Sequence, residues 1–577
     1  MTGDREDKKV KTAVEILRKS CDGNRAYKNA ERLSVFHRIP GTKGYEEAAG
    51  YTEQYLEAEQ IPYRLLSFPA DGKTVFLDRK AVRGWDCKCA WLELAGTEEN
   101  GLRLADWSAN PMSVIQRSGP GDYREQPLEI VMSDLLSGDE TNLEGKLLYI
   151  HEKADKYLQW AVEEQKVAGI ITDFMPEIVP VRHQGDIYDG TSYVSFPWTG
   201  LEEKNCIGFV LTPRMGRKLS EACRKQWEAF QTGGMAEPYV KARAYVDSEF
   251  FDGTFQVVEA EIAGKGEEAV VAAAHLCHPV SCANDNASGS AVLLEVVRVL
   301  KKLIGEGKLP QPRRTLRFIW GPEFLGTEAY LKRIGEKVSA IKGAVNLDMV
   351  GGMPEKTGAA FLFMKQPDSL PSVVYETASH VMDEACREMK MLALEGSVCN
   401  FLQAKVKFSP GSDNAVYSSP KIGIPCVTLT QWPDKFYHTS YDTIDKLDPA
   451  MLKRSCLICA ACLYVMADLG GEDERWLFSQ ARYQLTEDVG KAQKKWLLSE
   501  ARDSQTLRTE LEELERRWEE EIDTAKGFWQ ADEKKLQEQK DYGRRLLALY
   551  LEESELYGAG REEQTTGKGE TVWEDTY

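Results

Sequence analysis

The chain has 577 residues, of which 42% are hydrophobic, with 13 Trp and 23 Tyr, and its formal net charge is −19. This length predicts about two to four domains, and the apolar content excludes a globally disordered chain. The acidic balance argues against nucleic acid as a partner, because phosphate binding requires clustered Lys and Arg.

Targeting and redox signals favour a cytoplasmic protein. The N-terminal residues 1–17 are charged and contain no apolar run of the signal-peptide type. No stretch of about 18 or more apolar residues occurs, so no membrane partner is expected. The 13 cysteines are an odd number with irregular spacing, which argues against a disulfide framework. Cys456, Cys459 and Cys462 lie in an apolar helical pattern and are interpreted as core residues.

The first 250 residues show two different patterns of predicted secondary structure. Residues 10–36 predict helix, and residues 39–69 predict a Pro-Gly turn, a helix and a strand. From about 75 to 250, short β-like runs alternate with Gly, Pro and Asp punctuation. Within this region the pattern predicts a strand, a helix and a strand, at 144–150, 157–168 and 169–173.

After residue 250 the pattern becomes a regular alternation of strands and helices. Apolar strands are predicted at 266–276, 313–323, 341–351 and 423–431. Helices are predicted at 288–303, 327–334, 371–389 and 448–469. Continuous apolar strands between amphipathic helices predict an α/β fold with a mixed, largely parallel sheet covered on both faces. Ligand sites in such sheets lie at the carboxyl ends of the strands.

Beyond about residue 470 the composition is charged and helical. One apolar face is spaced at three or four residues and consists of Leu507, Leu511, Leu514, Trp518, Ile522, Ala525 and Trp529. This face predicts either a helical appendage packed on its own body or a coiled coil that forms a homo-oligomer. Residues 558–577 are predicted to be a disordered tail.

Polar side chains follow several of the predicted core strands. The set consists of His275, Asp285, Glu323, Asp348 and His438. Because the carboxyl ends of parallel strands meet at one edge of a sheet, these groups should converge. Two imidazoles and three carboxylates suit a pair of zinc ions that share a water molecule. Asp285 is the expected bridge, since the Gly and Ala around it allow close approach. Alone, each residue has an ordinary interpretation, such as a helix cap or a buried histidine.

These residues lie in motifs that resemble the zinc aminopeptidases of peptidase family M28. The matching segments are AAAHLCHP, DNASG, WGPEFLGT, NLDMVGG and HTSYDT, together with RIPGT near the N-terminus. The resemblance covers roughly residues 25–70 and 255–470. It implies a two-zinc hydrolase that removes N-terminal residues from peptides by means of an activated water.

The resemblance also implies a role for each residue. His275 and Asp348 would hold one zinc, Glu323 and His438 would hold the other, and Asp285 would bridge them. Tyr437 matches a position that stabilises the oxyanion in some relatives. Asp442 matches the Asp of the family's "DT" motif, where an outer position that orients a ligand is more plausible than direct coordination.

The middle region is similar to the protease-associated insert of several M28 members. The implied division has four parts: 1–72 (N-terminal part of the peptidase domain), 73–253 (protease-associated-like insert), 254–470 (main peptidase domain) and 471–577 (charged helical region with the tail). The insert would cover the active-site cleft or shape access to it.

Two departures from the family pattern affect the chemistry. The paired glutamates of typical relatives are replaced by Pro322-Glu323, and one glutamate cannot easily serve as both zinc ligand and general base. Either Glu323 is the ligand and the base comes from elsewhere, or Glu323 is the base and the set of ligands is altered. Glu328 and Asp413 are the nearest candidate substitutes for the missing group.

The second departure is HLCHP, where Cys277 replaces the family's orienting Asp and His278 follows. His278 is either an outer or pocket residue, or a metal ligand or proton relay. It can share a face with His275 only if the strand has ended by Leu276. The other histidines are interpreted as structural: His37, His151, His183 and His380.

Three functions therefore remain open. The first is a zinc aminopeptidase acting on peptides. The second is a related zinc amidohydrolase or cyclase acting on a small amide. The third is a degenerate peptidase that serves as a binding module, which the missing second glutamate would explain.

Overall fold

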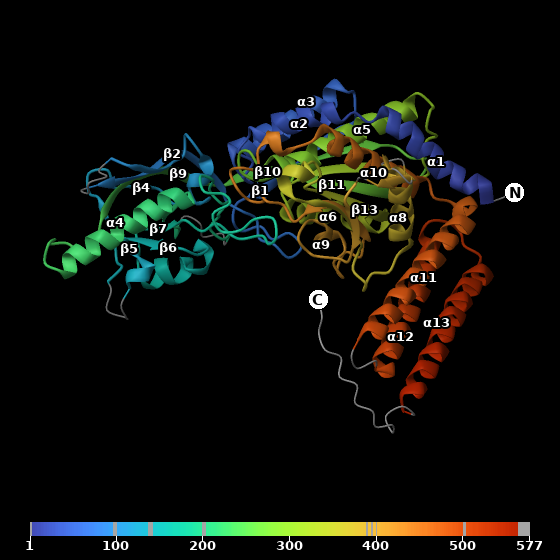
Figure 1. The fold of residues 1–577 in the computed structure, drawn as a ribbon. Coiled ribbons are helices and arrows are strands. Elements are labelled where there is room, and N and C mark those ends of the chain that lie inside the picture. Colours follow the sequence, from blue (N-terminus) through green and yellow to red (C-terminus); the bar gives the residue numbers. More distant parts are fainter. Residues whose placement is uncertain are drawn as a thin grey trace.

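The structure is a computed structural model that contains two eight-stranded sheets and a C-terminal group of helices (Figure 1). The residues that it describes are 3–95, 101–136, 142–198, 204–387, 390–393, 396–399, 401–499 and 503–562.

The N-terminal segment forms three helices and the edge strand of the main sheet. These are α1 (Gly3–Ser20), α2 (Gly23–Ser34), α3 (Lys43–Ala58) and β1 (Tyr63–Ala70). The Asp22 side chain accepts hydrogen bonds from the first backbone N–H groups of α2, and Thr42 does the same for α3. Gly23 lies so close to Pro449 that an added Cβ would fall 1.8 Å from its carbonyl oxygen. The start of α2 is thus packed closely against Pro449.

The main sheet has the strand order β1-β10-β12-β11-β13-β18-β14-β17. Its further strands are β10 (Gly253–Ile262), β11 (Ala269–His275), β12 (Thr315–Gly321), β13 (Ile341–Asp348), β14 (Ala360–Met364), β17 (Gln403–Val406) and β18 (Cys426–Trp432). The four central strands, β12, β11, β13 and β18, are parallel to one another, whereas β10 and β14 run antiparallel to their inner neighbours. The predicted mixed, largely parallel sheet is confirmed. A separate antiparallel pair is formed by β15 (Lys390–Ala393) and β16 (Gly396–Cys399).

Helices cover both faces of this sheet (Figure 1). They are α5 (Gly289–Gly305), α6 (Leu325–Ile334), α7 (Pro354–Thr357), α8 (Val373–Cys386), α9 (Asn414–Tyr417) and α10 (Pro449–Asp468). Helix α10 is long and apolar enough to cross a membrane, but 83% of its apolar window is buried inside the structure. It packs between α2, α5 and α8 and contains the buried Cys456, Cys459 and Cys462. These cysteines are core residues, as predicted.

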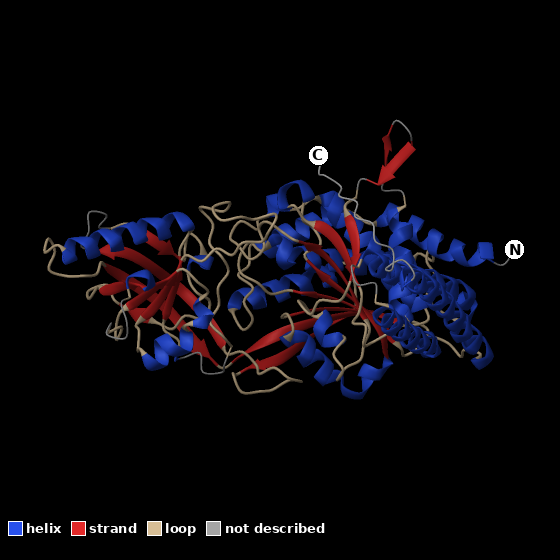
Figure 2. Cartoon of the chain, turned by 60° about the horizontal axis from the view of Figure 1, so that its bottom comes forward, coloured by secondary structure: helices blue, strands red, loops and turns tan. Residues whose placement is uncertain are grey.

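The second sheet is formed by the middle of the chain, in the order β3-β2-β9-β5-β6-β7-β8 with β4 paired to β9. The elements are β2 (Gly84–Ala95), β3 (Arg103–Asp106), β4 (Gly121–Asp122), β5 (Leu128–Met132), β6 (Leu147–Ile150), β7 (Gly169–Thr172), β8 (Ile207–Val210), α4 (Pro213–Gln231) and β9 (Lys241–Phe251). Figure 2 shows this sheet and the main sheet as two bodies with loops between them.

One predicted element of this second sheet is shorter than expected. The helix predicted at 157–168 is present only over residues 158–164, where its last five residues, Trp160–Glu164, form a π turn, and a 3-10 turn at Ala154–Lys156 precedes it. Lys166 then adopts a positive φ of 52°, and the chain turns directly into β7. The helix ends early because the residues that follow it, Gly169–Thr172, pair with β6 as strand β7.

The C-terminal helices are α11 (Glu474–Leu498), α12 (Ser504–Thr524) and α13 (Glu533–Glu562), and they lie side by side (Figure 1). The predicted apolar face of α12 is buried in the chain's own core at Leu507, Leu511, Leu514, Trp518 and Ile522. Packing on its own body thus accounts for this face. Helix α13 runs to Glu562, so the predicted tail does not begin at 558. Its remaining part, 563–577, lies outside the described residues.

A buried carboxyl pair joins the C-terminal helices to the main body. Glu376 on α8 and Glu521 on α12 are both buried, and they lie close enough for each carboxyl group to influence the pKa of the other. Burial raises the pKa of Glu521 to about 7 and also raises the pKa of Glu376 well above its usual range, with Lys365 opposing both shifts and Asp488 adding to them. Burial thus favours the protonated form of both carboxyl groups.

This pair predicts a pH-dependent stability. A carboxyl group whose pKa is raised by folding stabilises the protein fully below its unfolded pKa of about 4.3, and that contribution is lost as the pH rises to about 7. Glu521→Gln should remove this loss and raise the free energy of unfolding at pH 8 by about 1–3 kcal/mol relative to wild type. Urea unfolding of both proteins at pH 5.5 and pH 8 measures the effect. The exposed Glu512→Gln variant on the same helix is the control, and equal pH profiles for Glu521→Gln and wild type would contradict the assignment.

Candidate metal centre

The carboxyl ends of the four central parallel strands carry polar side chains, as the sequence predicted. His275 is the last residue of β11, and Asp348 is the last residue of β13. Glu323 follows β12 by two residues, and His438 follows β18 in a loop. Asp285 lies in the segment Ala283–Ser288 that leads into α5, at a kink where its own backbone angles and those of Asn286 are non-helical. The strand ends therefore bring together residues that are far apart in the chain.

The carboxylate of Asp285 lies at the middle of this cluster. Its Oδ1 is 3.4 Å from His275 Nε2, and its Oδ2 is 3.0 Å from His438 Nε2 and 3.4 Å from His278 Nε2. On the first side, His275 Nε2 is also 3.3 Å from Asp348 Oδ1. On the second side, the Nε2 atoms of His278 and His438 are 3.2 Å apart. The two oxygens of Asp285 thus face two different groups of donors.

These separations fit metal coordination. In a tetrahedral zinc site with bonds of about 2.0–2.1 Å, two donor atoms lie about 3.3 Å apart. The observed donor–donor distances of 3.0–3.4 Å match this value on both sides of Asp285. Asp348 Oδ1 is buried without a hydrogen bond that satisfies it, as expected for an atom that awaits a cation. Imidazole nitrogens and carboxylate oxygens are the donors that zinc prefers.

The grouping of the donors differs from the one implied by the M28 resemblance. Glu323 lies with His275 and Asp348, all within 4.8 Å of one another, and His438 lies with His278 and Asp285. The resemblance had paired Glu323 with His438 instead. His278 can reach the cluster because β11 ends at His275, which frees the following residues from the alternation of a strand.

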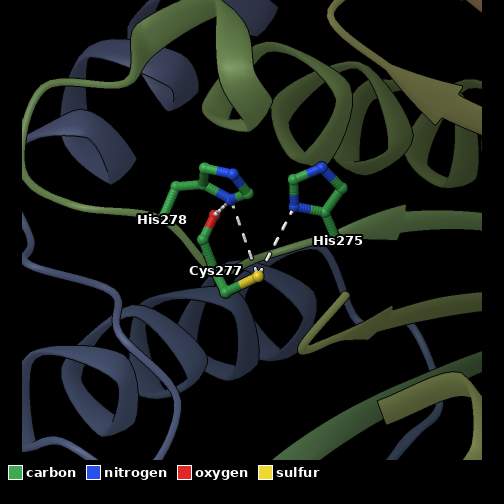
Figure 3. Close-up of side chains that lie close together, drawn as sticks. All are labelled: His275, Cys277 and His278. Atoms are coloured by element: carbon green, nitrogen blue, oxygen red, sulfur yellow. Dashed lines mark hydrogen bonds between the residues drawn. The ribbon is translucent and has the colours of Figure 1, made fainter. Parts of the chain in front are cut away.

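Hydrogen bonds at the outer nitrogens orient the two histidines from HLCHP. His278 Nδ1 lies 2.9 Å from the carbonyl oxygen of Cys277, and His275 Nδ1 lies 3.6 Å from the Cys277 sulfur (Figure 3). The backbone N–H of Glu323 donates to the same sulfur at 3.2 Å. An Nδ1–H that donates outward leaves the Nε2 lone pair directed toward the cluster, which is the usual arrangement of metal-bound histidine. Cys277 thus takes the orienting place of the family's Asp.

Arg38, from the RIPGT motif, holds the loop that carries His278. Its backbone N–H donates to the carbonyl of His278 at 2.9 Å, and the N–H of His278 donates back to the carbonyl of Arg38 at 3.0 Å. The buried guanidinium donates to the carbonyls of Leu276, Cys282 and Leu33. A buried arginine that satisfies several main-chain carbonyls fixes the loop in one conformation.

Several residues around the cluster have strained backbone. The φ angles are 129° at His278, 56° at Phe324, 57° at Met349 and 52° at His438. Non-glycine residues occupy this region rarely, and each costs of order 1–3 kcal/mol. Each of these residues belongs to the cluster or directly follows one of its members, so the surrounding packing must impose the conformation.

The DNASG and NLDMVGG motifs are tied together behind Asp285. The Asn286 side chain donates to Leu347 O at 2.8 Å and accepts from the N–H groups of Gly289 and Met349. A Cβ at Gly289 would lie 2.3 Å from Asn286 Oδ1, so this position requires glycine. These contacts hold the two motifs next to each other behind Asp285.

Asp442 supports Asp285 from the backbone. Its two oxygens accept hydrogen bonds from the N–H groups of Asn284 and Asp285, at 2.8 and 3.0 Å. Burial, followed by the charge of Asp434, raises the pKa of Asp442 to about 8. Asp442 is therefore positioned to orient Asp285 through the main chain, and its side chain does not point at the donors.

The ionisation of the cluster is set by its own charges. Burial by itself raises the pKa of Asp285. The imidazoles of His278, His438 and His275 together lower this pKa by a larger amount, so the net shift is downward. For Glu323, burial raises the pKa well above its usual range, and the nearby carboxylates of Asp348 and Asp413 add to the shift. One carboxylate thus stays charged while another favours a proton.

The remaining predicted residues have different positions. Asp413 is buried and accepts a hydrogen bond from the N–H of Phe324 at 2.7 Å, beside Glu323. Glu328 lies away from the donors and accepts hydrogen bonds from the Arg79 backbone and guanidinium. It is thus occupied elsewhere and does not replace the missing glutamate. Tyr437 stacks on the ring of His438, with centroids 3.8 Å apart.

Tyr193, in the middle segment of the chain, also reaches the cluster. Its ring packs edge-on against His438 and His278, at centroid distances of 5.3 and 5.6 Å, and its N–H donates to the carbonyl of His438. His438 therefore contacts both Tyr193 and Tyr437, and 30% of its side chain remains exposed. Nothing in the TSYVSFP segment marks Tyr193 as a site residue, because the contact depends on how the two sheets meet.

An apolar pocket opens beside Asp348 and Tyr437. Its volume is about 390 Å³, and its apolar lining comes from Met349, Leu362, Met364, Val406 and Trp432. Such a pocket next to a polar cluster is the usual form of a small-molecule site.

The Arg38 contacts predict a large loss of stability on substitution. Arg38→Met would leave the carbonyls of Leu276, Cys282 and Leu33 without their donor, at a cost of about 1–3 kcal/mol for each buried group. We expect the free energy of unfolding, measured with urea, to fall by at least about 3 kcal/mol. Arg32→Met, at an exposed arginine of the neighbouring helix α2, is the matched control. Equal stability of the two variants would contradict the role of Arg38.

The comparisons with known proteins agree with this fold. The chain is 28% identical over 256 residues to a Clostridium acetobutylicum protein described as a polysaccharide biosynthesis protein with an aminopeptidase-like domain, covering 44% of this chain and 46% of that one. It is 28% identical over 189 residues to aminopeptidase YwaD of Bacillus subtilis, covering 32% of this chain and 37% of that one. The chain thus spans less than half the length of these curated relatives.

Two solved structures share the fold at low sequence identity. A zinc aminopeptidase from Bacillus subtilis matches with a TM-score of 0.54 at 18% identity, covering 78% of this chain and 95% of that one. A peptidase M28 precursor from Shewanella amazonensis matches with a TM-score of 0.55 at 17% identity, covering 80% of this chain and 98% of that one. The fold is therefore that of the M28 peptidases, which confirms the resemblance seen in the motifs.

A family model identifies the family to which the chain belongs. The model described as "Domain of unknown function (DUF4910)" matches residues 99–468, which include most of the second sheet and most of the main sheet with its donor cluster. Since the match covers more than half of the chain, the protein belongs to the DUF4910 family.

Proposed function

We propose that this protein is a zinc-dependent hydrolase of the aminopeptidase type, which removes N-terminal residues from peptides. The observation that supports this function best is Asp285, whose two oxygens face two separate groups of metal donors. The donor atoms suit two ions, and two metal ions are a common arrangement in aminopeptidases. The names of the Bacillus relative and of the fold neighbours, which are aminopeptidases, agree with this reaction.

The chain's own residues supply positioning and proton transfer. When bound, zinc would polarise the scissile carbonyl and lower the pKa of a water molecule. Glu323, whose pKa burial raises, is suited to accept a proton from the attacking water and to pass it to the leaving amine. The free α-amine of a peptide is a cation, so a carboxylate near the centre that does not bind a metal would attract it.

The aromatic residues around His438 would shield the reaction from bulk water. Tyr193 and Tyr437 cover two sides of this ring. Tyr437 also lines the apolar pocket, so its hydroxyl is our candidate donor to the oxyanion. An apolar side chain in the pocket would hold the scissile bond next to Asp348.

The organisation of the chain supports two further assignments. We assign residues 73–253 as a protease-associated-like insert that shapes access to the centre, because Tyr193 belongs to this segment. We also propose the cytoplasm as the location, since the described cysteines are free thiols.

Metal removal tests the proposed function directly. Dialysis against a chelator should abolish hydrolysis of aminoacyl-anilides, and added zinc should restore it. Asp285→Asn should lose both metals and lower kcat/KM by at least about 100-fold, whereas the exposed Asp445→Asn variant should behave as wild type.

The same assay separates the alternatives. Activity that survives complete removal of metal would contradict a metal-dependent hydrolase. Hydrolysis of N-acyl compounds with no cleavage of peptides would favour a zinc amidohydrolase. Bound metal without hydrolysis of either substrate class would favour a binding module.

A further inference from the structure

We propose that His278 replaces the missing second glutamate as a metal ligand, so that His278, Asp285 and His438 hold the second metal and Glu323 is left free for proton transfer. This inference rests on the proposed function, because it assigns the ligands of the same centre. It also departs from the M28 pattern, in which a glutamate completes the second site.

The geometry of the three donors carries the proposal. Asp285 Oδ2 lies 3.0 Å from His438 Nε2 and 3.4 Å from His278 Nε2, and the two nitrogens are 3.2 Å apart. All three separations are close to the value of about 3.3 Å expected for ligands of one tetrahedral zinc. Three protein ligands also leave a fourth position open, which is the form of catalytic zinc sites.

An ordinary hydrogen-bonded histidine explains His278 less well. Its Nδ1 lies 2.9 Å from the carbonyl of Cys277, so a neutral ring carries its hydrogen there. The Nε2 lone pair then faces a carboxylate oxygen of Asp285 in a buried site. Two electron-rich atoms that face each other without a cation repel, whereas a metal ion between them removes the conflict.

The backbone of His278 is strained, and its neighbours hold it in this conformation. Its φ of 129° is unfavourable for a residue with a side chain. The paired main-chain hydrogen bonds to Arg38 and the ring of Tyr193 maintain this conformation. Strain of this kind persists where the surroundings over-determine the geometry, as they do at functional sites.

On the first side of the centre, His275, Asp285 and Asp348 would hold the other metal. His275, Asp285 and Asp348 supply three donor atoms there, at 3.4 and 3.3 Å from His275 Nε2. With His278 on the second side, each metal has three protein ligands and Asp285 is shared. Glu323 is then an additional carboxyl group at the edge of the first site, which is the position that a proton acceptor requires.

Metal content measured on purified full-length variants tests the ligand assignment. We expect two zinc ions per chain for wild type and one for His278→Ala, with the affinity for the second ion reduced by more than about 100-fold, because even the loss of an outer partner costs 10–100-fold. His278→Glu, which restores a carboxylate ligand, should retain two ions. His151→Ala removes a different histidine that is paired with an aspartate, Asp173, and should also retain two.

Cobalt substitution and anomalous diffraction give readouts that do not depend on activity. The visible absorption of the cobalt protein should lose the contribution of one site in His278→Ala. In crystals of wild type, a zinc anomalous peak should lie about 2.0–2.1 Å from His278 Nε2, which tests the ligand even where a variant does not fold. Glu323→Gln should keep both ions and lower kcat by about 10²–10⁴-fold.

The outcomes distinguish this inference from the proposed function. Wild type with two ions and His278→Ala with two ions at unchanged affinity would overturn the assignment of His278 alone. Loss of one ion in Glu323→Gln would overturn the proton-transfer role and make Glu323 a ligand. Wild type without bound metal at any zinc concentration would overturn both the proposed function and this inference.

Discussion

The carboxylate of Asp285 is the group around which the centre is arranged. A buried carboxylate is costly unless its charge is compensated, which the metal ions proposed on either side of it would do, while Asp442 fixes its backbone. Its two oxygens face different donors, so neither side can shift without disturbing the other. The small residues of DNASG and the contacts of Asn286 to the next strand follow from this requirement, because they bring two strand ends into close approach.

Contacts from Arg38 stabilise the loop between β11 and α5, which carries His278 and Asp285. The loop has few regular hydrogen bonds of its own, and Arg38 supplies donors to its carbonyls from a distant part of the sequence. The strained φ values at His278 and at His438 lie where function and local preference conflict. A stable sheet on one side and a buried guanidinium on the other make such a conformation tolerable.

Two additions to the peptidase fold meet the centre in different ways. The middle segment reaches it through Tyr193, which touches two of the histidines. The C-terminal helices instead pack on α8 and join the body through the Glu376–Glu521 pair. The first addition therefore contacts the donor cluster, whereas the second packs on the main body.

The sequence by itself determined the class of the main sheet, the order of its strands and helices, and the convergence of His275, Asp285, Asp348 and His438. These features follow from local patterns, since apolar periodicity defines each element and parallel strands must end at one edge. The sequence did not decide the partner of Glu323, the position of His278, the distance of Glu328 from the centre or the contact of Tyr193. Each of these depends on where a loop turns after its strand has ended, or on how two sheets meet. Such turns are set by tertiary contacts, above all those of Arg38, and no local pattern records them.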